Sequence, residues 1–268
     1  MTEEKKLANL IRYTLSSVAQ LYAPDHAGVS LVEEDGVRYL HFGTPWVQGG
    51  MRLDDPYGIE IEYLQQMMMW MLFNPQPAHI VQLGLGAASL SKFCWHQFPD
   101  SKVTSVELQQ AVIDICRSGF ALPPNDERLN VVAMDAMDFV LNPANHGTVD
   151  ILQVDLYDAH ARGPVLSSLE FYEACAQCLT PDGLITVNVF CDYPEHQHHL
   201  GLMEQAFHAV AWLPEVHDSN IVAIGFKHAS AIDFSELSLR AEQIQQQTGL
   251  PAQTWVGGLQ TWMQEHST

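Results

Sequence analysis

The chain has 268 residues, of which 47% are hydrophobic, so it is long enough and apolar enough for one large α/β domain with a small addition. Its 12 basic and 32 acidic side chains give a formal net charge of −20, which repels a phosphate backbone and argues against nucleic acid as a partner. The sequence has no run of about 18 apolar residues and no signal-peptide core near Met1, so we expect no membrane span and a cytoplasmic location.

The first quarter of the chain predicts a helix and then a small antiparallel β module. Apolar residues recur at helical spacing over residues 3–22, and Pro24 ends this pattern. Gly36 marks a hairpin turn between the first two of three strand-like runs, which cover residues 29–33, 37–42 and 46–53. Residues 58–73 have the pattern of a helix, and their methionines indicate core packing or a subunit contact.

From residue 79 onward, strand-like and helix-like segments alternate. Strands are expected at 80–83, 103–107, 129–133, 149–154 and 184–190, and helices at 89–97, 109–120, 136–141, 168–178 and 198–209. Two more strands, at 212–217 and 221–226, predict an antiparallel pair, and a helix at 235–247 follows. This spacing predicts an α/β fold with a mostly parallel sheet and an antiparallel last strand. We expect a module of residues 1–57, a Rossmann-like domain of residues 58–230 and a helical tail of residues 231–268.

Polar features stand at the ends of three successive predicted strands. Gly84-Leu-Gly86 directly follows the first strand, Glu107 ends the second, and Asp135 follows the third. Glycines let a backbone approach a ligand closely, and a carboxylate at a strand end accepts hydrogen bonds from a ribose. Because the carboxyl ends of parallel strands meet in one crevice, these residues predict a site for an adenosine-containing ligand. An ordinary tight strand-to-helix turn is the alternative for the glycine pair.

The fourth predicted strand ends in a pair of acids, Asp155 and Asp158, with Tyr157 between them. A carboxylate at this place can hold a substrate ammonium or remove a proton from an attacking nitrogen. The negative charge of the chain is compatible with such a cationic substrate, although solubility alone is a sufficient reason for an acidic surface. The alternative for Asp155 is a cap of the following turn.

Other reactive side chains give no site. His196, His198 and His199 lack the spacing of a metal centre and favour the solvated start of a helix, so we expect no metal. The five cysteines include Cys175-x-x-Cys178 without a second pair, which indicates reduced, buried thiols. The sequence has neither a Gly-x-Ser-x-Gly elbow nor a phosphate-binding Gly-Lys-Ser or Gly-Lys-Thr, so hydrolase and kinase functions are not favoured.

Over residues 29 to 228, the chain resembles the spermidine synthase family, the polyamine aminopropyltransferases. The resemblance is carried by motifs in the same order as in that family, namely Gln48, Tyr63, Gly84 and Gly86, Val106-Glu107, Asp135-Ala136, Asp155 and Asp158, Phe171-Tyr172, Leu179-Thr-Pro-Asp-Gly183 and Ile224-Gly225-Phe226. It implies a small N-terminal β domain followed by a Rossmann-like domain with the fold of S-adenosylmethionine-dependent methyltransferases, and a homodimer formed through the β domain.

The resemblance also implies roles for individual residues. Asp155 corresponds to the proposed catalytic base of the family. The amine substrate would be bound by Tyr63, Tyr157 and Asp158. The cofactor, S-adenosylmethionine or its decarboxylated form, would be bound by Gln48, Gly84, Gly86, Ala87, Glu107, Asp135 and Ala136. The reaction would leave methylthioadenosine or S-adenosylhomocysteine as its product.

Ala87 departs from the family pattern, which has an aspartate there. That aspartate would bind the ammonium of the aminopropyl chain, and a charge-assisted hydrogen bond of this kind contributes roughly 1.5–3 kcal/mol. Ordinary S-adenosylmethionine carries a carboxylate of its own, which an alanine does not repel. Both aminopropyl and methyl transfer to an amine are therefore expected possibilities. The alternative is a non-catalytic homologue that serves as an adenosyl- or polyamine-binding module or an interaction module.

Overall fold

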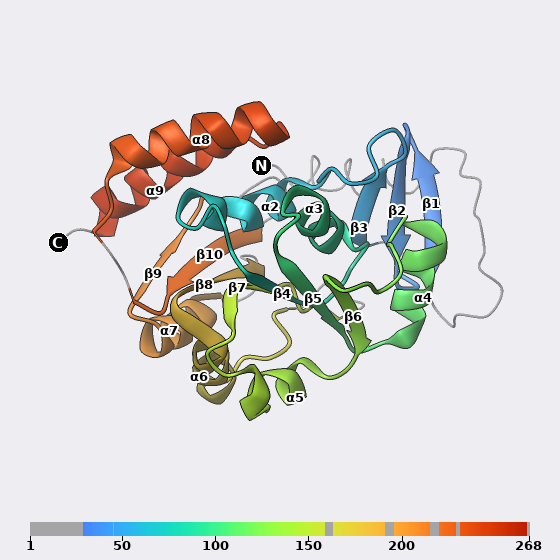
Figure 1. The fold of residues 1–268 in the computed structure, drawn as a ribbon, viewed down its shortest axis with the longest axis horizontal. Helices are drawn as coiled ribbons and strands as arrows, with labels where there is room; N and C mark the ends of the chain where they lie inside the picture. Colours follow the sequence, from blue (N-terminus) through green and yellow to red (C-terminus); the bar gives the residue numbers. More distant parts are fainter. Residues whose placement is uncertain are drawn as a thin grey trace.

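A computed structural model of the chain describes residues 29–44, 46–158, 163–190, 196–214, 220–228 and 231–266, and the helix predicted over residues 3–22 lies outside these. The β module is a three-stranded antiparallel sheet in the order β1-β2-β3, at the right of Figure 1. Its strands are β1 (Ser30–Glu34), β2 (Val37–His41) and β3 (Val47–Arg52). Asp35 and Gly36 have φ angles of 50° and 79°, as a two-residue hairpin turn requires. The predicted antiparallel arrangement of these three strands is confirmed.

The main sheet has seven strands in the order β6-β5-β4-β7-β8-β10-β9. These strands are β4 (His79–Leu83), β5 (Lys102–Glu107), β6 (Leu129–Ala133), β7 (Val149–Val154), β8 (Leu179–Phe190), β9 (Ala209–Trp212) and β10 (Asn220–Phe226). Strands β4 to β8 pair in parallel, and β10 is antiparallel to both of its neighbours. The predicted fold class is confirmed. Because β5 and β7 lie on opposite sides of β4, the strand order reverses there, which is where ligands bind in open α/β sheets.

Helices cover both faces of the main sheet (Figure 1). One apolar core includes Ile80 and lies against α3 (Ser89–Gln97), α4 (Gln110–Gly119), α8 (Phe234–Thr248) and α9 (Ala252–His266). The other core includes Val81 and lies against α5 (Ala136–Leu141), α6 (Leu169–Cys178) and α7 (His196–Ala206). Successive residues of a strand point to opposite faces, so a strand buried on both sides is continuously apolar.

The helix predicted over residues 58–73 is wrong in its start and in its type. Gly58 forms a turn with Asp55, α2 covers only Glu62–Gln66, and a 3₁₀ helix, η1, covers Met67–Leu72. All six residues of η1 are buried, so contacts on every side, rather than helix propensity, set its geometry. The methionines of η1 are packed in the core of the chain, which leaves them unavailable for a subunit contact.

Several other elements also differ from expectation. Strand β8 begins at Leu179, because the predicted Pro181–Gly183 turn is an irregularity inside the strand, between two pairs with β7. Strand β9 covers Ala209–Trp212 and ends where a strand was expected to begin. The tail was predicted as helical without bounds for a second helix, and beyond residue 250 it forms α9; a short 3₁₀ helix that was not predicted, η2 (Pro143–Asn145), follows α5.

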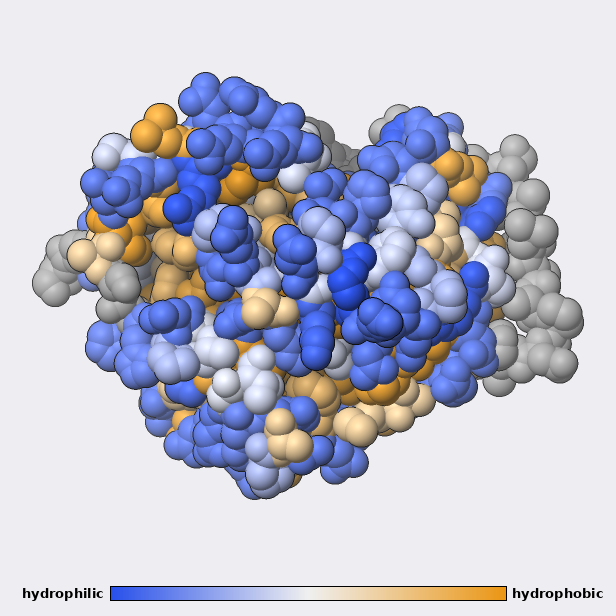
Figure 2. All heavy atoms as spheres, in the orientation of Figure 1, coloured by the Kyte–Doolittle hydropathy of each residue, from blue (hydrophilic) through white to orange (hydrophobic). Residues whose placement is uncertain are grey.

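The described residues include no helix that is long and apolar enough to cross a membrane. The face drawn in Figure 2 is mostly hydrophilic, and hydrophobic residues gather beneath α8 and α9. Such a surface agrees with the net charge of −20.

Candidate functional site

The loop after β4 brings the ends of β4 and β7 into contact. Gly84 and Gly86 have φ angles of 86° and 51°, which favour glycine, and a side chain on Gly84 would collide with the backbone carbonyl of Asp155. The Asp155 N–H donates to Leu83 O at 2.9 Å. The glycine loop and the acidic loop after β7 are therefore neighbours, as the sheet topology predicts.

Glu107 holds the glycine loop in place from the end of β5. Its Oε2 accepts a hydrogen bond from Leu85 N at 3.0 Å, and its Oε1 accepts one from Gln109 N at 2.9 Å. The side chain is 9% exposed, and burial raises the pKa of its carboxyl, against the effect of the backbone donors. Each carboxylate oxygen has a second lone pair, so Glu107 can support the loop and still accept from a ribose hydroxyl.

Asp135 occupies the N-cap of α5, directly after β6. Its Oδ1 accepts a hydrogen bond from Met137 N at 2.7 Å, and Ala136 beside it is buried. Capping explains part of the preference for an acid here. The side chain itself is exposed at the same edge of the sheet as Glu107.

Two apolar residues at this edge were not predicted as site residues. Leu108 is 67% exposed and Met134 is 39% exposed, and they stand next to Glu107 and Asp135. The signal that could have identified them is the direct sequence neighbourhood of a large apolar residue and a strand-end acid. Exposed apolar side chains beside two carboxylates form a surface on which a flat heterocycle can pack.

Strand β3 lies against the glycine loop. Ser89 Oγ donates to Gly50 O at 2.9 Å, and a side chain on Gly86 would approach Gln48 O to 2.9 Å. A Cβ on Gly49 would be 2.6 Å from both the N and the Cβ of Ala87, which is 2% exposed. The Ala87 side chain therefore packs on the β module, and the glycine at position 49 makes this contact possible.

We expect Gly49→Ala to lower the free energy of unfolding by about 1–3 kcal/mol, because the added methyl overpacks the contact with Ala87. Gly50→Ala is the matched control on the same strand, since its Cβ would lie 3.4 Å from the Tyr39 ring, an ordinary contact. Urea unfolding of both variants measures the difference. Equal stability of the two variants would contradict the tight contact between β3 and the glycine loop.

Asp155 receives two side-chain donors. Its Oδ1 accepts from Asn188 Nδ2 at 2.9 Å, and its Oδ2 accepts from Tyr63 OH at a longer 3.4 Å. Burial raises the pKa of this carboxyl to about 6, and the two donors act in the opposite direction. A carboxylate with this pKa is ionised at neutral pH and is a stronger proton acceptor than an ordinary aspartate.

Two further predicted residues follow Asp155 in its loop. The Tyr157 hydroxyl donates to Asn188 O at 3.1 Å, and burial raises the pKa of this phenol. Gln48 Nε2 donates to the backbone carbonyl of Asp158 at 3.5 Å, so the β module also contacts this loop. The structure thus brings Gln48, Tyr63 and the acidic loop together, although they are far apart in sequence.

His199 and four of the cysteines are buried. His199 is buried, which corrects the expectation of a solvated helix start, because its Nδ1 lies 2.9 Å from Tyr172 OH and burial lowers its pKa to about 4. Cys94, Cys116 and the Cys175-x-x-Cys178 pair are free and buried, as expected, and Cys191 lies outside the described residues. Within the described ranges, no group of three or more His, Cys, Asp or Glu side chains is arranged to hold a metal.

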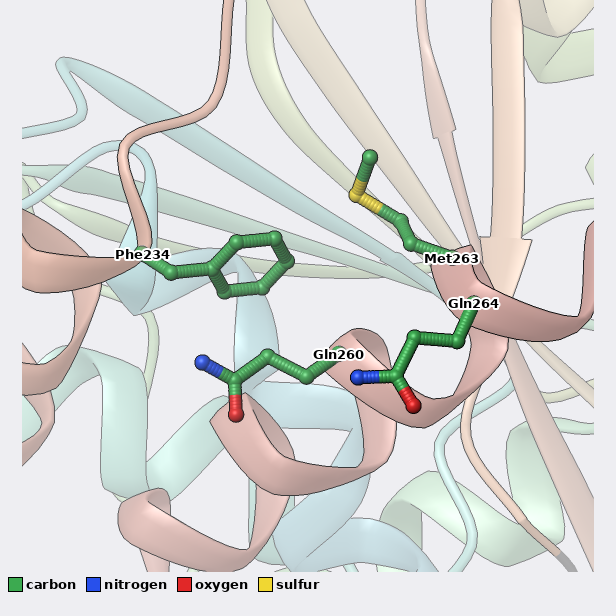
Figure 3. A pocket seen from close by; sticks show the side chains of 4 residues that line it. All are labelled: Phe234, Gln260, Met263 and Gln264. Carbon is green, nitrogen blue, oxygen red and sulfur yellow. The ribbon is translucent and has the colours of Figure 1, made fainter. Parts of the chain in front are cut away.

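A separate hollow of about 430 Å³ lies between the start of α8 and the end of α9. Figure 3 shows the side chains that line it, which are Phe234, Gln260, Met263 and Gln264. None of them is charged and none belongs to the predicted site. The chemistry-bearing residues are at the strand ends instead.

Comparison with known proteins points to one family. The model of the spermine/spermidine synthase domain family matches residues 62–212. A polyamine aminopropyltransferase of Chromobacterium violaceum is 28% identical over 239 residues, which cover 88% of this chain and 91% of that protein.

Solved structures share the fold. A spermidine synthase in complex with the transition-state analogue AdoDATO superposes with a TM-score of 0.71 at 15% identity, over 92% of this chain and 88% of the other. The human methyltransferase-like protein 13 in complex with SAH gives a TM-score of 0.62 at 20% identity, over 71% and 93%. At these identities, the likeness concerns the fold alone.

Proposed function

Because the chain belongs to the spermine/spermidine synthase family, we propose that it is an alkyltransferase that moves an alkyl group from an adenosyl sulfonium to an amine. The observation that carries this proposal is the Asp155 carboxylate, whose pKa is raised to about 6, beside the glycine loop. This retained acid and its two donors favour an enzyme over the non-catalytic alternative.

The residues at the strand ends fit an adenosyl group. Gly84 and Gly86 let the loop backbone approach the ligand, Glu107 would accept from the ribose, and Asp135 would accept from the adenine amino group. The exposed side chains of Leu108 and Met134 would pack on the faces of the adenine. Ala136 and Gln48 complete the predicted cofactor site.

A bound sulfonium would supply an electrophilic carbon and a neutral thioether as the leaving group. Asp155 Oδ2 would take a proton from the substrate ammonium, and the free nitrogen lone pair would then form the new C–N bond as the C–S bond breaks. Tyr63, Tyr157 and Asp158 would hold the amine in line with that carbon. Most of the rate enhancement would come from this alignment.

The nature of the alkyl group depends on the surroundings of Ala87. Residue 87 is an alanine whose side chain packs against Gly49. This position therefore supplies no carboxylate to bind an aminopropyl ammonium. Calorimetry with S-adenosylmethionine, its decarboxylated form and methylthioadenosine tests the proposal. We expect micromolar binding of methylthioadenosine and of one sulfonium, which identifies the alkyl group. Failure of all three to bind would overturn the transferase proposal.

We further propose a polyamine as the acceptor and a cytoplasmic homodimer as the functional form. The net charge of −20 favours a cationic acceptor. The dimer is what the family resemblance implies, and the β module has two large exposed apolar side chains, Trp46 at 43% and Leu53 at 41%, at the two ends of β3.

A further inference from the structure

The two oxygens of the Asp155 carboxylate have unequal surroundings. Oδ1 accepts a short hydrogen bond, 2.9 Å, from Asn188, which is 1% exposed. Within the described part of the chain, the hydrogen-bond donor to Oδ2 is the hydroxyl of Tyr63, at a longer 3.4 Å. Oδ1 is thus firmly hydrogen-bonded to a residue of the sheet, and Oδ2 is the more weakly hydrogen-bonded acceptor.

Asn188 itself accepts hydrogen bonds from two other residues. Its Oδ1 accepts from Asn220 Nδ2 at 2.9 Å, and its backbone carbonyl accepts from the hydroxyl of Tyr157 at 3.1 Å. Asn220 is 7% exposed at the start of β10, so the chain of donors runs from β10 through β8 to the acid. An ionised carboxylate is an acceptor only, which fixes the direction of both amides in this chain.

Strand register places the amide opposite the acid. Gln153 pairs with Thr186 and Val154 pairs with Val187, so the next residues along the two strands are Asp155 and Asn188. Most buried polar side chains have a hydrogen-bond partner, and the acceptor for the Asn188 NH₂ group is the candidate catalytic acid.

We propose that Asn188, supported by Asn220, is a positioning residue that fixes the rotamer of Asp155, so that Oδ1 is structural and Oδ2 receives the proton. The assignment of proton transfer rests on the proposed function, whereas the positioning contact itself does not. Among the described residues, the titratable groups that act on Asp155 are the phenols of Tyr63 and Tyr157. Asn188 is therefore a neutral donor that holds the acid without competing for its proton.

The test is a ¹³C NMR titration of the Asp155 carboxyl in the ligand-free protein, with its signal identified by its loss in Asp155→Asn. In Asn188→Leu, we expect the pKa of Asp155 to rise by about one to two units, since a hydrogen bond to the charged form is lost. Asn220→Ala is expected to give a smaller rise in the same direction, because Asn188 is then less firmly held. This second variant decides the question if Asn188→Leu does not fold.

Thr186→Val is the matched control, since Thr186 is buried on the same strand, two residues away, and its hydroxyl has no partner among the described atoms. It should leave the titration of Asp155 unchanged. In turnover assays, Asn188→Leu should lower kcat at neutral pH while the KM for the cofactor stays within about twofold of the wild-type value. An Asp155 pKa in Asn188→Leu or Asn220→Ala equal to that of the wild type overturns the proposal. Because the titration needs no ligand, this result is independent of whether the transferase proposal holds.

Discussion

Replacing Asp155 with Asn is expected to reduce turnover by about 10²- to 10⁴-fold, the usual contribution of a general base. The amide has the same shape, but it cannot take a proton from the substrate. It can still offer its oxygen to the Asn188 donor, so the fold and the cofactor site should remain intact. Single-turnover assays at saturating cofactor measure the chemical step, and calorimetry checks that cofactor affinity stays within about twofold.

The pH dependence gives an independent readout of the same acid. Because the pKa of Asp155 is raised to about 6, wild-type turnover should fall as the pH drops through 6, where the carboxyl becomes protonated. The effect of pH on folding stability has the opposite sign to its effect on turnover. A carboxyl pKa above its unfolded value means that the native state binds more protons between about pH 4 and 6, so its contribution to stability is lost as the pH rises through that window. Asp155→Asn should therefore be more stable than the wild type above pH 6, by about 1–3 kcal/mol.

Asp182→Asn is the control for both measurements, since Asp182 is an exposed carboxylate in the irregular part of β8. It should change neither turnover nor its pH profile. If Asp155→Asn kept more than about a tenth of wild-type turnover, the base would have to be another group.

The strand-end residues could be predicted from the sequence because their placement depends on local pattern and on one topological rule. Gly84, Glu107 and Asp135 each follow an apolar run, and the parallel sheet brings the ends of such runs to one edge. No contact between distant segments had to be known. The same reasoning placed Asp155 at the end of β7.

The residues around that acid depend on contacts between distant segments. Asn188 meets Asp155 only through the register of β7 and β8, which the irregularity at residues 180–183 shifts by several positions. The packing of Ala87 on Gly49 depends on how the β module sits on the loop. The 3₁₀ form of η1 depends on burial of the whole segment. Sequence patterns report periodicity within an element, so they carry none of this information.

The second large effect is expected for Glu107→Gln, which should weaken binding of an adenosyl ligand by at least about 10- to 100-fold. Glu107 accepts from Leu85 N and from Gln109 N, one bond at each oxygen. A glutamine has one acceptor oxygen and an NH₂ donor, so one of the two backbone N–H groups would face another donor. Each bond to the charged group contributes roughly 1.5–3 kcal/mol, and about 1.4 kcal/mol is a factor of ten in affinity.

Calorimetry with methylthioadenosine measures this loss, and Glu127→Gln, at an exposed position, is the control. A ligand with 2′-deoxyribose separates the two roles of Glu107. If the acid accepts from the ribose, the ratio of wild-type to variant affinity should shrink for the deoxy ligand, and the ratio that remains measures support of the loop. If the ratio is the same for both ligands, Glu107 does not accept from the ribose 2′-hydroxyl. If Glu107→Gln binds methylthioadenosine as tightly as the wild type does, the adenosyl site is not at the end of β5.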